Sequence, residues 1–182
     1  MKLVKNSPFF YLIILFVSVF ILRLLALSEI SNNNYFNNYA MPNDSFFEIR
    51  GALEYIFPYY PEKIASYLPD YGYKSFINHM FSIFGDSLSS IRIFQLTFSL
   101  LMIFPIYYIG KMLGNKLTGS IAAFFWAFSG EILLYDLLIL KYSLTFSLTI
   151  LTMLVFIFYL KNTNKLILFL LLILIFILSL FR

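Results

Sequence analysis

The sequence predicts an all-α polytopic membrane protein with about five transmembrane helices, and an outer layer of interfacial helices that follows the first. Composition is the first observation behind this prediction. Of the 182 residues, 61% are hydrophobic and only 12% are charged, so a water-soluble fold of this size would leave much apolar surface exposed. The hydrophobic residues also gather in segments of membrane-crossing length, and lysines mark alternate links between these segments.

The hydrophobic segments set the expected membrane helices. A bilayer core needs roughly 20 helical residues. The segments that approach this length are Phe9–Leu27, Ile91–Ile109, Leu117–Tyr135, Tyr142–Leu160 and Leu166–Phe181. Small residues such as Gly119 and Ser129 in the third segment favour a position inside the bundle. No small-residue cleavage site follows the first segment, which is therefore interpreted as a retained anchor rather than a signal peptide.

Lysines predict the orientation of the chain. They lie before the first segment and in the links after the second and fourth, as Lys2, Lys5, Lys111, Lys116, Lys161 and Lys165. If the helices alternate, these three places share one side, which the positive-inside rule makes cytoplasmic. We therefore expect a multi-pass protein of the plasma (inner) membrane with a cytoplasmic N-terminus. The extracytoplasmic loop Ser28–Ser87 is richer in acidic than in basic residues.

Helical spacing of apolar residues continues inside this outer loop. Phe46–Phe57 is predicted to be an amphipathic helix at the membrane surface. Two further helices are expected at Glu62–Leu68 and Lys74–Phe84, and the second ends at Gly85, a typical residue after a helix C-terminus. There is no internal repeat or low-complexity linker, so residues 1–182 are predicted to form one membrane domain.

Two aspartates in the outer loop are candidate catalytic groups. Asp44 precedes the first interfacial helix, where it is either an N-cap or a base that takes a proton from an acceptor hydroxyl. Asp70 lies between Pro69 and Gly72, either as a turn residue or as a second carboxylate that works with Asp44. These two residues alone do not specify a metal, so no cofactor is assigned, although a divalent ion stays an open alternative.

Several charged residues fall near the outer membrane edge. The cations there run against the positive-inside trend: Arg23, Arg92, Lys141 and Arg182. Glu131 and Asp136 precede Lys141 around the same link, so mutual pairing is one explanation. Binding of a lipid phosphate at this depth is the other. Basic residues are otherwise scattered, so the net charge of +4 indicates no nucleic-acid partner.

The order of these features resembles a known family. The stretches that carry the resemblance are "MPNDSFFEIRGALEY", the segment Leu68–Leu144 that begins "LPDYGYKSF", and the closing "LSLFR". In this order and spacing the chain resembles the N-terminal part of polytopic glycosyltransferases of the C superfamily. The closest group looks like the microbial relatives of protein O-mannosyltransferases and lipid A aminoarabinose transferases. Gly110–Gly114 matches the family's glycine-flanked cytoplasmic link.

The resemblance implies an activity and a set of roles. The donor would be a sugar on a polyprenyl phosphate, and transfer to a lipid, glycan or protein acceptor would invert the sugar in a single displacement. Asp44 would act as the base with Asp70 beside it, while Lys141 and Arg182 would bind the donor phosphate. The chain would then serve cell-envelope glycosylation, with membrane lipids around it.

The chain also departs from the family pattern. Tyr142 stands where relatives often have a glutamate after the lysine, so that carboxylate role does not carry over. Relatives continue for several further helices, so we expect activity to need a C-terminal half beyond Arg182. The competing interpretation is a non-enzymatic membrane protein, such as a lipid carrier, a transporter half or an assembly scaffold, whose charges serve helix packing.

Overall fold

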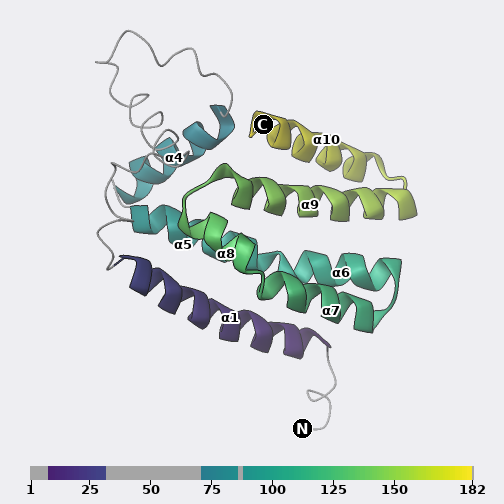
Figure 1. The fold of residues 1–182 in the computed structure, drawn as a ribbon. Helices are drawn as coiled ribbons and strands as arrows, with labels where there is room; N and C mark the ends of the chain where they lie inside the picture. The colour runs from purple at the N-terminus through teal and green to yellow at the C-terminus, as the bar shows by residue number, and fades with distance from the viewer. Residues whose placement is uncertain (1–7, 32–70, 86–87, 182) are drawn as a thin grey trace.

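The protein is a helical bundle (Figure 1). A computed structural model describes residues 8–31, 71–85 and 88–181, and no strand occurs within these ranges. The helices are α1 (Pro8–Ser31), α4 (Tyr71–Phe84), α5 (Leu88–Leu101), α6 (Ile103–Leu113), α7 (Lys116–Ala127), α8 (Gly130–Leu137), α9 (Lys141–Lys161) and α10 (Lys165–Leu180). The predicted all-α class is confirmed for this part of the chain.

Three helical stretches are long and apolar enough to cross a membrane: Pro8–Ile30, Leu88–Leu113 and Lys141–Lys161. α7 and α8 count as a fourth if the pair is one span, although they are bent by 43°. The shorter α10 is apolar but falls below the length of a full span. All five predicted segments therefore lie on helices, and three or four of them meet the requirements for a crossing.

Two of these stretches are interrupted for reasons visible in the sequence. α5 gives way to α6 at Met102, three residues before Pro105, whose ring cannot donate to the carbonyl of Leu101 and crowds it. α7 stops before Ser129, whose hydroxyl accepts a hydrogen bond from the Ile132 N–H and so caps the start of α8. The cap starts a new helix in a new direction, which explains the bend.

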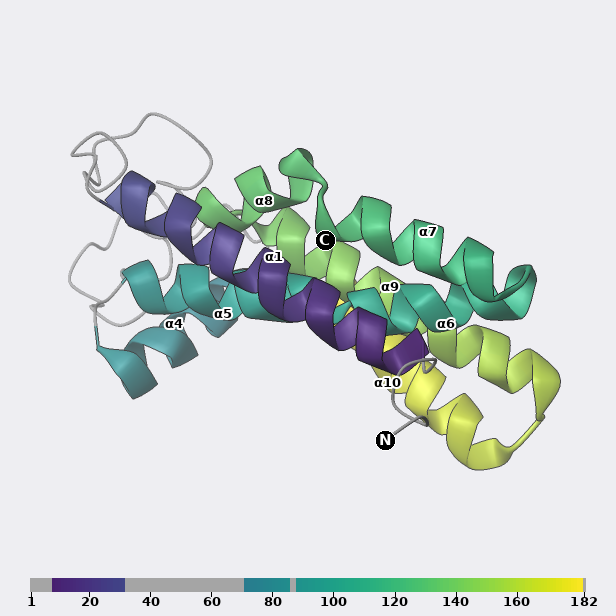
Figure 2. The same cartoon turned by 90° about the horizontal axis from the view of Figure 1, so that it is seen from below.

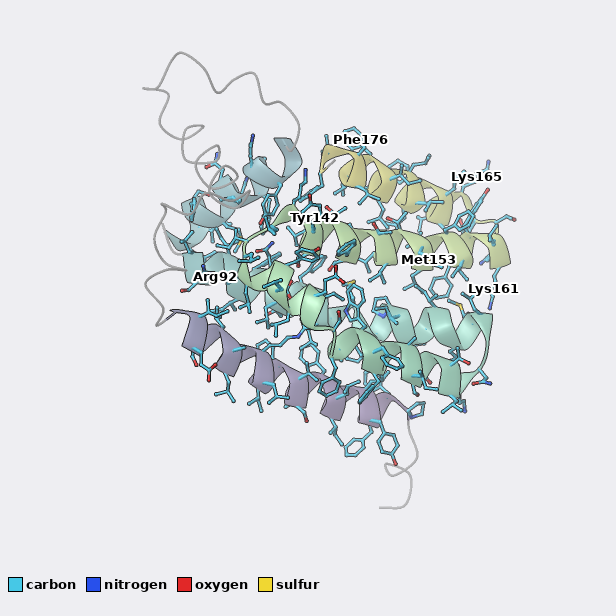
Figure 3. The ribbon with its side chains drawn as sticks, viewed as in Figure 1. Arg92, Tyr142, Met153, Lys161, Lys165 and Phe176 are labelled. Carbon is cyan, nitrogen blue, oxygen red and sulfur yellow. The ribbon has the colours of Figure 1, made fainter. Side chains whose placement is uncertain are left out.

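The bundle has two distinct ends, and both views agree on them (Figures 1 and 2). At the lysine end, defined by Pro8 and the links 114–115 and 162–164, lie the start of α1 and the α6–α7 and α9–α10 turns. At the corner end, defined by α4, residues 138–140 and Phe181, lie the C-terminal end of α1 and the last turn of α10. Figure 3 shows Lys161 and Lys165 at the lysine end, far from Arg92 and Tyr142.

This arrangement confirms one part of the predicted topology. The described lysine-bearing links lie together at one end of the bundle, as alternation of the helices requires. Which side of the membrane that end faces stays a prediction.

Helix α4 covers the corner end. It begins at Tyr71, three residues before the predicted start at Lys74, because its first turn is anchored by packing. Gly72 lies so close to Leu180 that an added Cβ would approach the Leu180 carbonyl oxygen to 2.5 Å. The helix ends as predicted before Gly85, which has a φ of 72° in the left-handed region. The other two predicted interfacial helices, Phe46–Phe57 and Glu62–Leu68, lie outside the described residues.

The distribution of side chains suits lipid rather than water as the solvent. Large apolar side chains on the outside stay exposed, for example Phe125 at 71% and Leu166 at 73%. The buried polar and charged side chains gather inside instead: Arg23, Arg92, Gln95, Ser99, Asp136, Ser143 and Ser147. Apolar groups facing outward with polar groups paired inside is the pattern expected for a bundle in a bilayer.

Candidate functional site

The predicted site residues fall largely outside the described part of the chain. Asp44, Asp70 and Arg182 are not among the described residues, so their proposed roles stay predictions. Lys141 is described, and it occupies the first position of α9 at the corner end, half-buried. Its Nζ lies 5.9 Å from the centroid of the Tyr142 ring, within the range of a cation–π contact. Tyr142 thus contacts the lysine before it.

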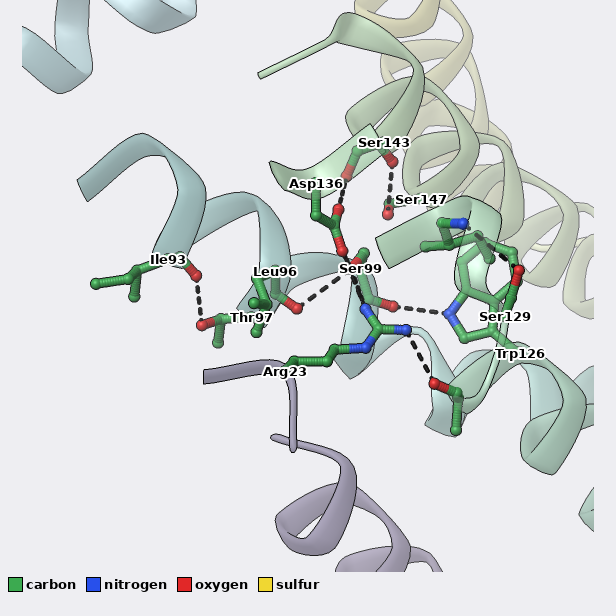
Figure 4. A network of polar contacts seen from close by, with 12 residues as sticks. Arg23, Ile93, Leu96, Thr97, Ser99, Trp126, Ser129, Asp136, Ser143 and Ser147 are labelled. Carbon is green, nitrogen blue, oxygen red and sulfur yellow. Dashed lines mark hydrogen bonds and ion pairs between the residues drawn. The ribbon is translucent and has the colours of Figure 1, made fainter. Parts of the chain in front are cut away.

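A buried ion pair lies at the centre of the bundle (Figure 4). Arg23 of α1 and Asp136 of α8 approach to 3.0 Å, and their side chains are 3% and 0% exposed. The same guanidinium donates to the Ser99 hydroxyl at 3.1 Å and to the Ala127 carbonyl at 3.0 Å. Arg23 occupies the buried stripe of α1 that also carries Val19 and Leu27, so helical periodicity turns it inward.

The Asp136 carboxylate is satisfied by groups from three helices. Its Oδ2 accepts from Arg23 and from the Ser99 hydroxyl of α5 at 2.6 Å. Its Oδ1 accepts from the Ser143 hydroxyl of α9. Trp126 adds a further tie, because its indole N–H donates to the Ser99 carbonyl at 2.8 Å. A carboxylate so enclosed and so fully bonded suits helix packing rather than proton exchange with a substrate.

Two other polar side chains of α5 hold the link between α8 and α9. The Arg92 Nε donates to the Leu137 carbonyl at 2.9 Å, and the Gln95 amide nitrogen donates to the Leu140 carbonyl at 3.0 Å. Gln95 also donates to the Tyr73 hydroxyl at 3.0 Å, which joins α4 to the same link. The bond from Arg92 satisfies a carbonyl that the end of α8 would otherwise leave unpaired in an apolar interior. The two bonds from Gln95 join α5 to the start of α9 and to α4.

The backbone of this link is strained. Ile139 has a φ of 56°, a conformation that a β-branched side chain rarely adopts. The N–H of Leu140 reaches back to the Tyr135 carbonyl at 3.4 Å, a bond that ends a helix through a left-handed residue usually occupied by glycine. Burial of the Ile139 side chain offsets the cost of this conformation, since Ile139 is 1% exposed among Ile77, Ile91 and other core residues. Packing and hydrogen bonds together therefore keep the corner in one shape.

The structure corrects the reading of two outer cations. The sequence places Arg23 and Arg92 near the membrane edge, with binding of a lipid phosphate as one of two interpretations. Both side chains are buried, at 2% and 4% exposed, and they donate hydrogen bonds to groups that include Asp136, Ser99 and backbone carbonyls. The position of a cation in the sequence does not indicate its partner, because the partner of a buried cation lies on a helix distant in sequence.

Pairing among the charged residues near the corner also differs from the simplest expectation. Asp136 forms its ion pair with Arg23, which is distant in sequence, rather than with a neighbour on its own segment. Glu131 accepts a hydrogen bond from the Tyr135 hydroxyl at 3.2 Å and is exposed. Within the described ranges no group of acidic and histidine side chains could hold a metal ion.

Gln95 and Ser99 of α5 were missed by sequence reasoning, although a signal for them exists. Arg92, Gln95 and Ser99 recur at spacings of three and four, which places them on one face of a helix. Ser143 and Ser147 repeat the spacing on α9. Two polar stripes on otherwise apolar helices predict that these faces meet each other. In the structure Ser99 and Ser143 both donate to Asp136, and Ser147 donates to the Ser143 carbonyl.

Comparisons with protein-family models, curated proteins and solved structures find no match to this chain. The resemblance to C-superfamily glycosyltransferases therefore stays an expectation, carried by the quoted stretches.

Proposed function

We propose that the chain forms the N-terminal membrane part of an enzyme that transfers a sugar from a polyprenyl-phosphate donor to a lipid, glycan or protein acceptor at the outer membrane face. The observation that supports the proposal best is the strained corner between α8 and α9. Arg92 and Gln95 hold its carbonyls, and Lys141 follows immediately at the start of α9. A cation on a rigid support beside an apolar bundle suits a lipid-linked phosphate.

The proposed chemistry is one displacement at the sugar's anomeric carbon. The acceptor hydroxyl forms the new bond to that carbon while the bond to the phosphate oxygen breaks. Asp44 takes the hydroxyl proton, and Lys141 balances the charge that grows on the departing polyprenyl phosphate. Inversion follows because the acceptor attacks opposite the leaving group. Asp70 and Arg182 keep the supporting roles assigned from the sequence.

Lys141→Gln tests the phosphate contact. A charge-assisted hydrogen bond contributes about 1.5–3 kcal/mol, so the substitution should raise the apparent KM for the lipid donor by about tenfold or more. Transfer kinetics in membranes that contain the whole enzyme measure this. Lys165→Gln is the matched control, because Lys165 also opens a helix but lies at the opposite end of the bundle. Lower stability with an unchanged KM would assign Lys141 to packing.

Asp44→Asn tests the base. The amide still caps a helix but cannot accept the proton, so transfer should fall by about 10²–10⁴-fold while membrane levels hold. Asp70→Asn should give a smaller loss. An Asp44→Asn enzyme within a few-fold of the parent would remove Asp44 from the mechanism.

A specific observation favours the competing non-enzymatic function. Arg23 and Arg92 are buried among helices and serve packing, as a carrier or scaffold would also require. Mass spectrometry of lipid-linked sugars and glycans from cells with and without the gene separates the two. An unchanged glycan and lipid-linked sugar profile would favour the carrier or scaffold.

A further inference from the structure

A groove runs between α1 and α7 at the lysine end of the bundle. Its volume is about 450 Å³, inside the range of roughly 300–1,000 Å³ typical of small-molecule sites. The lining includes Tyr11, Leu12 and Leu15 from α1, and Lys116, Ser120 and Phe124 from α7. The proposed transfer chemistry lies at the corner end, so this groove is independent of it.

The lining of the groove changes in polarity with depth. Lys116, Ser120 and Phe124 are four residues apart and so share one face of α7, which descends about 6 Å per step from the lysine end. A cation, a hydroxyl and an aromatic ring therefore follow one another inward. On α1 the phenol of Tyr11 precedes Leu12 and Leu15 in the same direction. This order matches a phospholipid, whose charged phosphate lies above the glycerol and the acyl chains.

The groove is accessible from the outside of the bundle. Tyr11 and Phe124 are 60% and 51% exposed, whereas Leu12 is 4% exposed and belongs to the core that α1 shares with α5, α6 and α7. Exposed aromatic flanks beside a buried leucine leave an apolar channel open to its surroundings. Because α1 and α7 are apolar helices, those surroundings are lipid.

We propose that this groove binds one anionic glycerophospholipid, with its phosphate at Lys116 and an acyl chain along Leu12, Leu15 and Phe124. The charge of the groove selects the headgroup. Lys116 is an exposed cation, and no acidic side chain is among the described residues that line the groove. A lysine near the membrane surface raises the affinity for an anionic lipid by about tenfold or less. The headgroup phosphate, and not free phosphate, is the ligand because the apolar channel holds the chain.

The full chain in nanodiscs of equal dioleoyl-phosphatidylglycerol and dioleoyl-phosphatidylcholine provides the test. Native mass spectrometry of the released protein counts the retained lipids of each kind. The parent should keep one phosphatidylglycerol in preference to phosphatidylcholine. Lys116→Gln should lower that retention by about fivefold. Inorganic phosphate added to the sample should not displace the bound lipid.

Lys165→Gln is the control for general charge. Asn115 and Asn164 each cap a helix with the side chain, and Lys116 and Lys165 each follow as the first helical residue, exposed and at the same end. Lys165 lies outside the groove, so Lys165→Gln should leave retention unchanged. Equal losses from both variants would overturn the proposal, because the lysines would then act only as surface charge.

Ser120→Leu tests the groove itself with Lys116 intact. The added side chain occupies the middle of the channel and should lower phosphatidylglycerol retention as strongly as Lys116→Gln. Full retention in this variant would show that the channel holds no chain and would overturn the proposal. Equal retention of phosphatidylcholine by the parent, or a dimer that carries no lipid, would do the same.

Discussion

Asp136 shows at the scale of one residue why a charge can lie inside an apolar bundle. Removing a carboxylate from water is expensive, and a single partner rarely compensates the loss. Here Arg23, Ser99 and Ser143 supply donors from three other helices, and each donor is itself buried. The charge therefore orients α1, α5, α8 and α9 relative to one another.

Breaking this pair should be strongly destabilising. Asp136→Leu leaves the Arg23 guanidinium buried without its counter-ion, and such changes cost about 3–5 kcal/mol. Arg23→Leu should cost a similar amount. The double variant should recover a large part of the loss, because neither charge then remains buried. Thermal unfolding of the four proteins in detergent measures the coupling.

Glu131→Gln is the control for that double-mutant cycle, since Glu131 is exposed and its hydrogen bond from Tyr135 stays within α8. It should change stability by less than about 0.5 kcal/mol. Additive losses from the two single variants would mean that Arg23 and Asp136 are not coupled.

Within the helices and at their ends, glycines serve different structural roles. At the α6–α7 crossing, a Cβ on Gly119 would clash with the Tyr107 carbonyl oxygen, so the close approach of the two helices depends on the lack of a side chain there. Gly85 and Gly130, by contrast, have nothing within 4 Å of an added Cβ. These two differ in backbone, since only Gly85 has a positive φ.

Gly119→Ala should separate α6 from α7. Overpacking of a tight contact costs about 1–3 kcal/mol, and here the neighbour that must move is backbone. The loss should appear as a lower midpoint of thermal unfolding. A stability equal to the parent would show that the helices can part without cost.

Gly85→Ala and Gly130→Ala form a matched pair. Both sites have room for the methyl group, so only the backbone separates their outcomes. Gly85→Ala should destabilise by about 1–2 kcal/mol, because the left-handed conformation crowds a Cβ. Gly130→Ala should be neutral or stabilise by about 0.4–1 kcal/mol through the unfolded chain. Equal effects would contradict the role assigned to the φ of Gly85.

The whole molecule separates its tasks between two ends. The corner end carries the strained link and α4, while the lysine end carries the cationic turns and the groove between α1 and α7 (Figure 1). The ion-pair network lies between the two ends. Alternating helices produce this division, because links after even-numbered crossings return to the same side. The sidedness of the membrane then decides which end meets the cytoplasm.

Labelling of single cysteines tests that sidedness. The chain has no cysteine of its own, so each introduced thiol reports alone. A cysteine at Asn33, in the predicted outer loop, should react with an impermeant thiol reagent in intact cells. A cysteine at Asn115, in the link at the lysine end, should react only after the membrane is opened. The reverse pattern would place Asp44 and Lys141 on the wrong side for an outer-face enzyme.

Much of the helical framework follows from the sequence alone. The segments around Phe9–Leu27 and Tyr142–Leu160 lie on α1 and α9, and the stop at Gly85 occurs where glycine predicts it. These features depend on local physics, namely apolar length, helical period and the conformational freedom of glycine. The lysine-bearing links also lie together at one end, since alternation of helices needs no long-range information.

The partners of the buried charges were decided only by the tertiary structure. Arg23 and Asp136 are 113 positions apart, and nothing local indicates that they meet. The left-handed conformation of Ile139 is likewise invisible in sequence, because local preference opposes it and only burial and the clamps from Arg92 and Gln95 enforce it. Local propensity sets where helices form, but pairing across the bundle depends on which faces meet, and that is a property of the packed molecule.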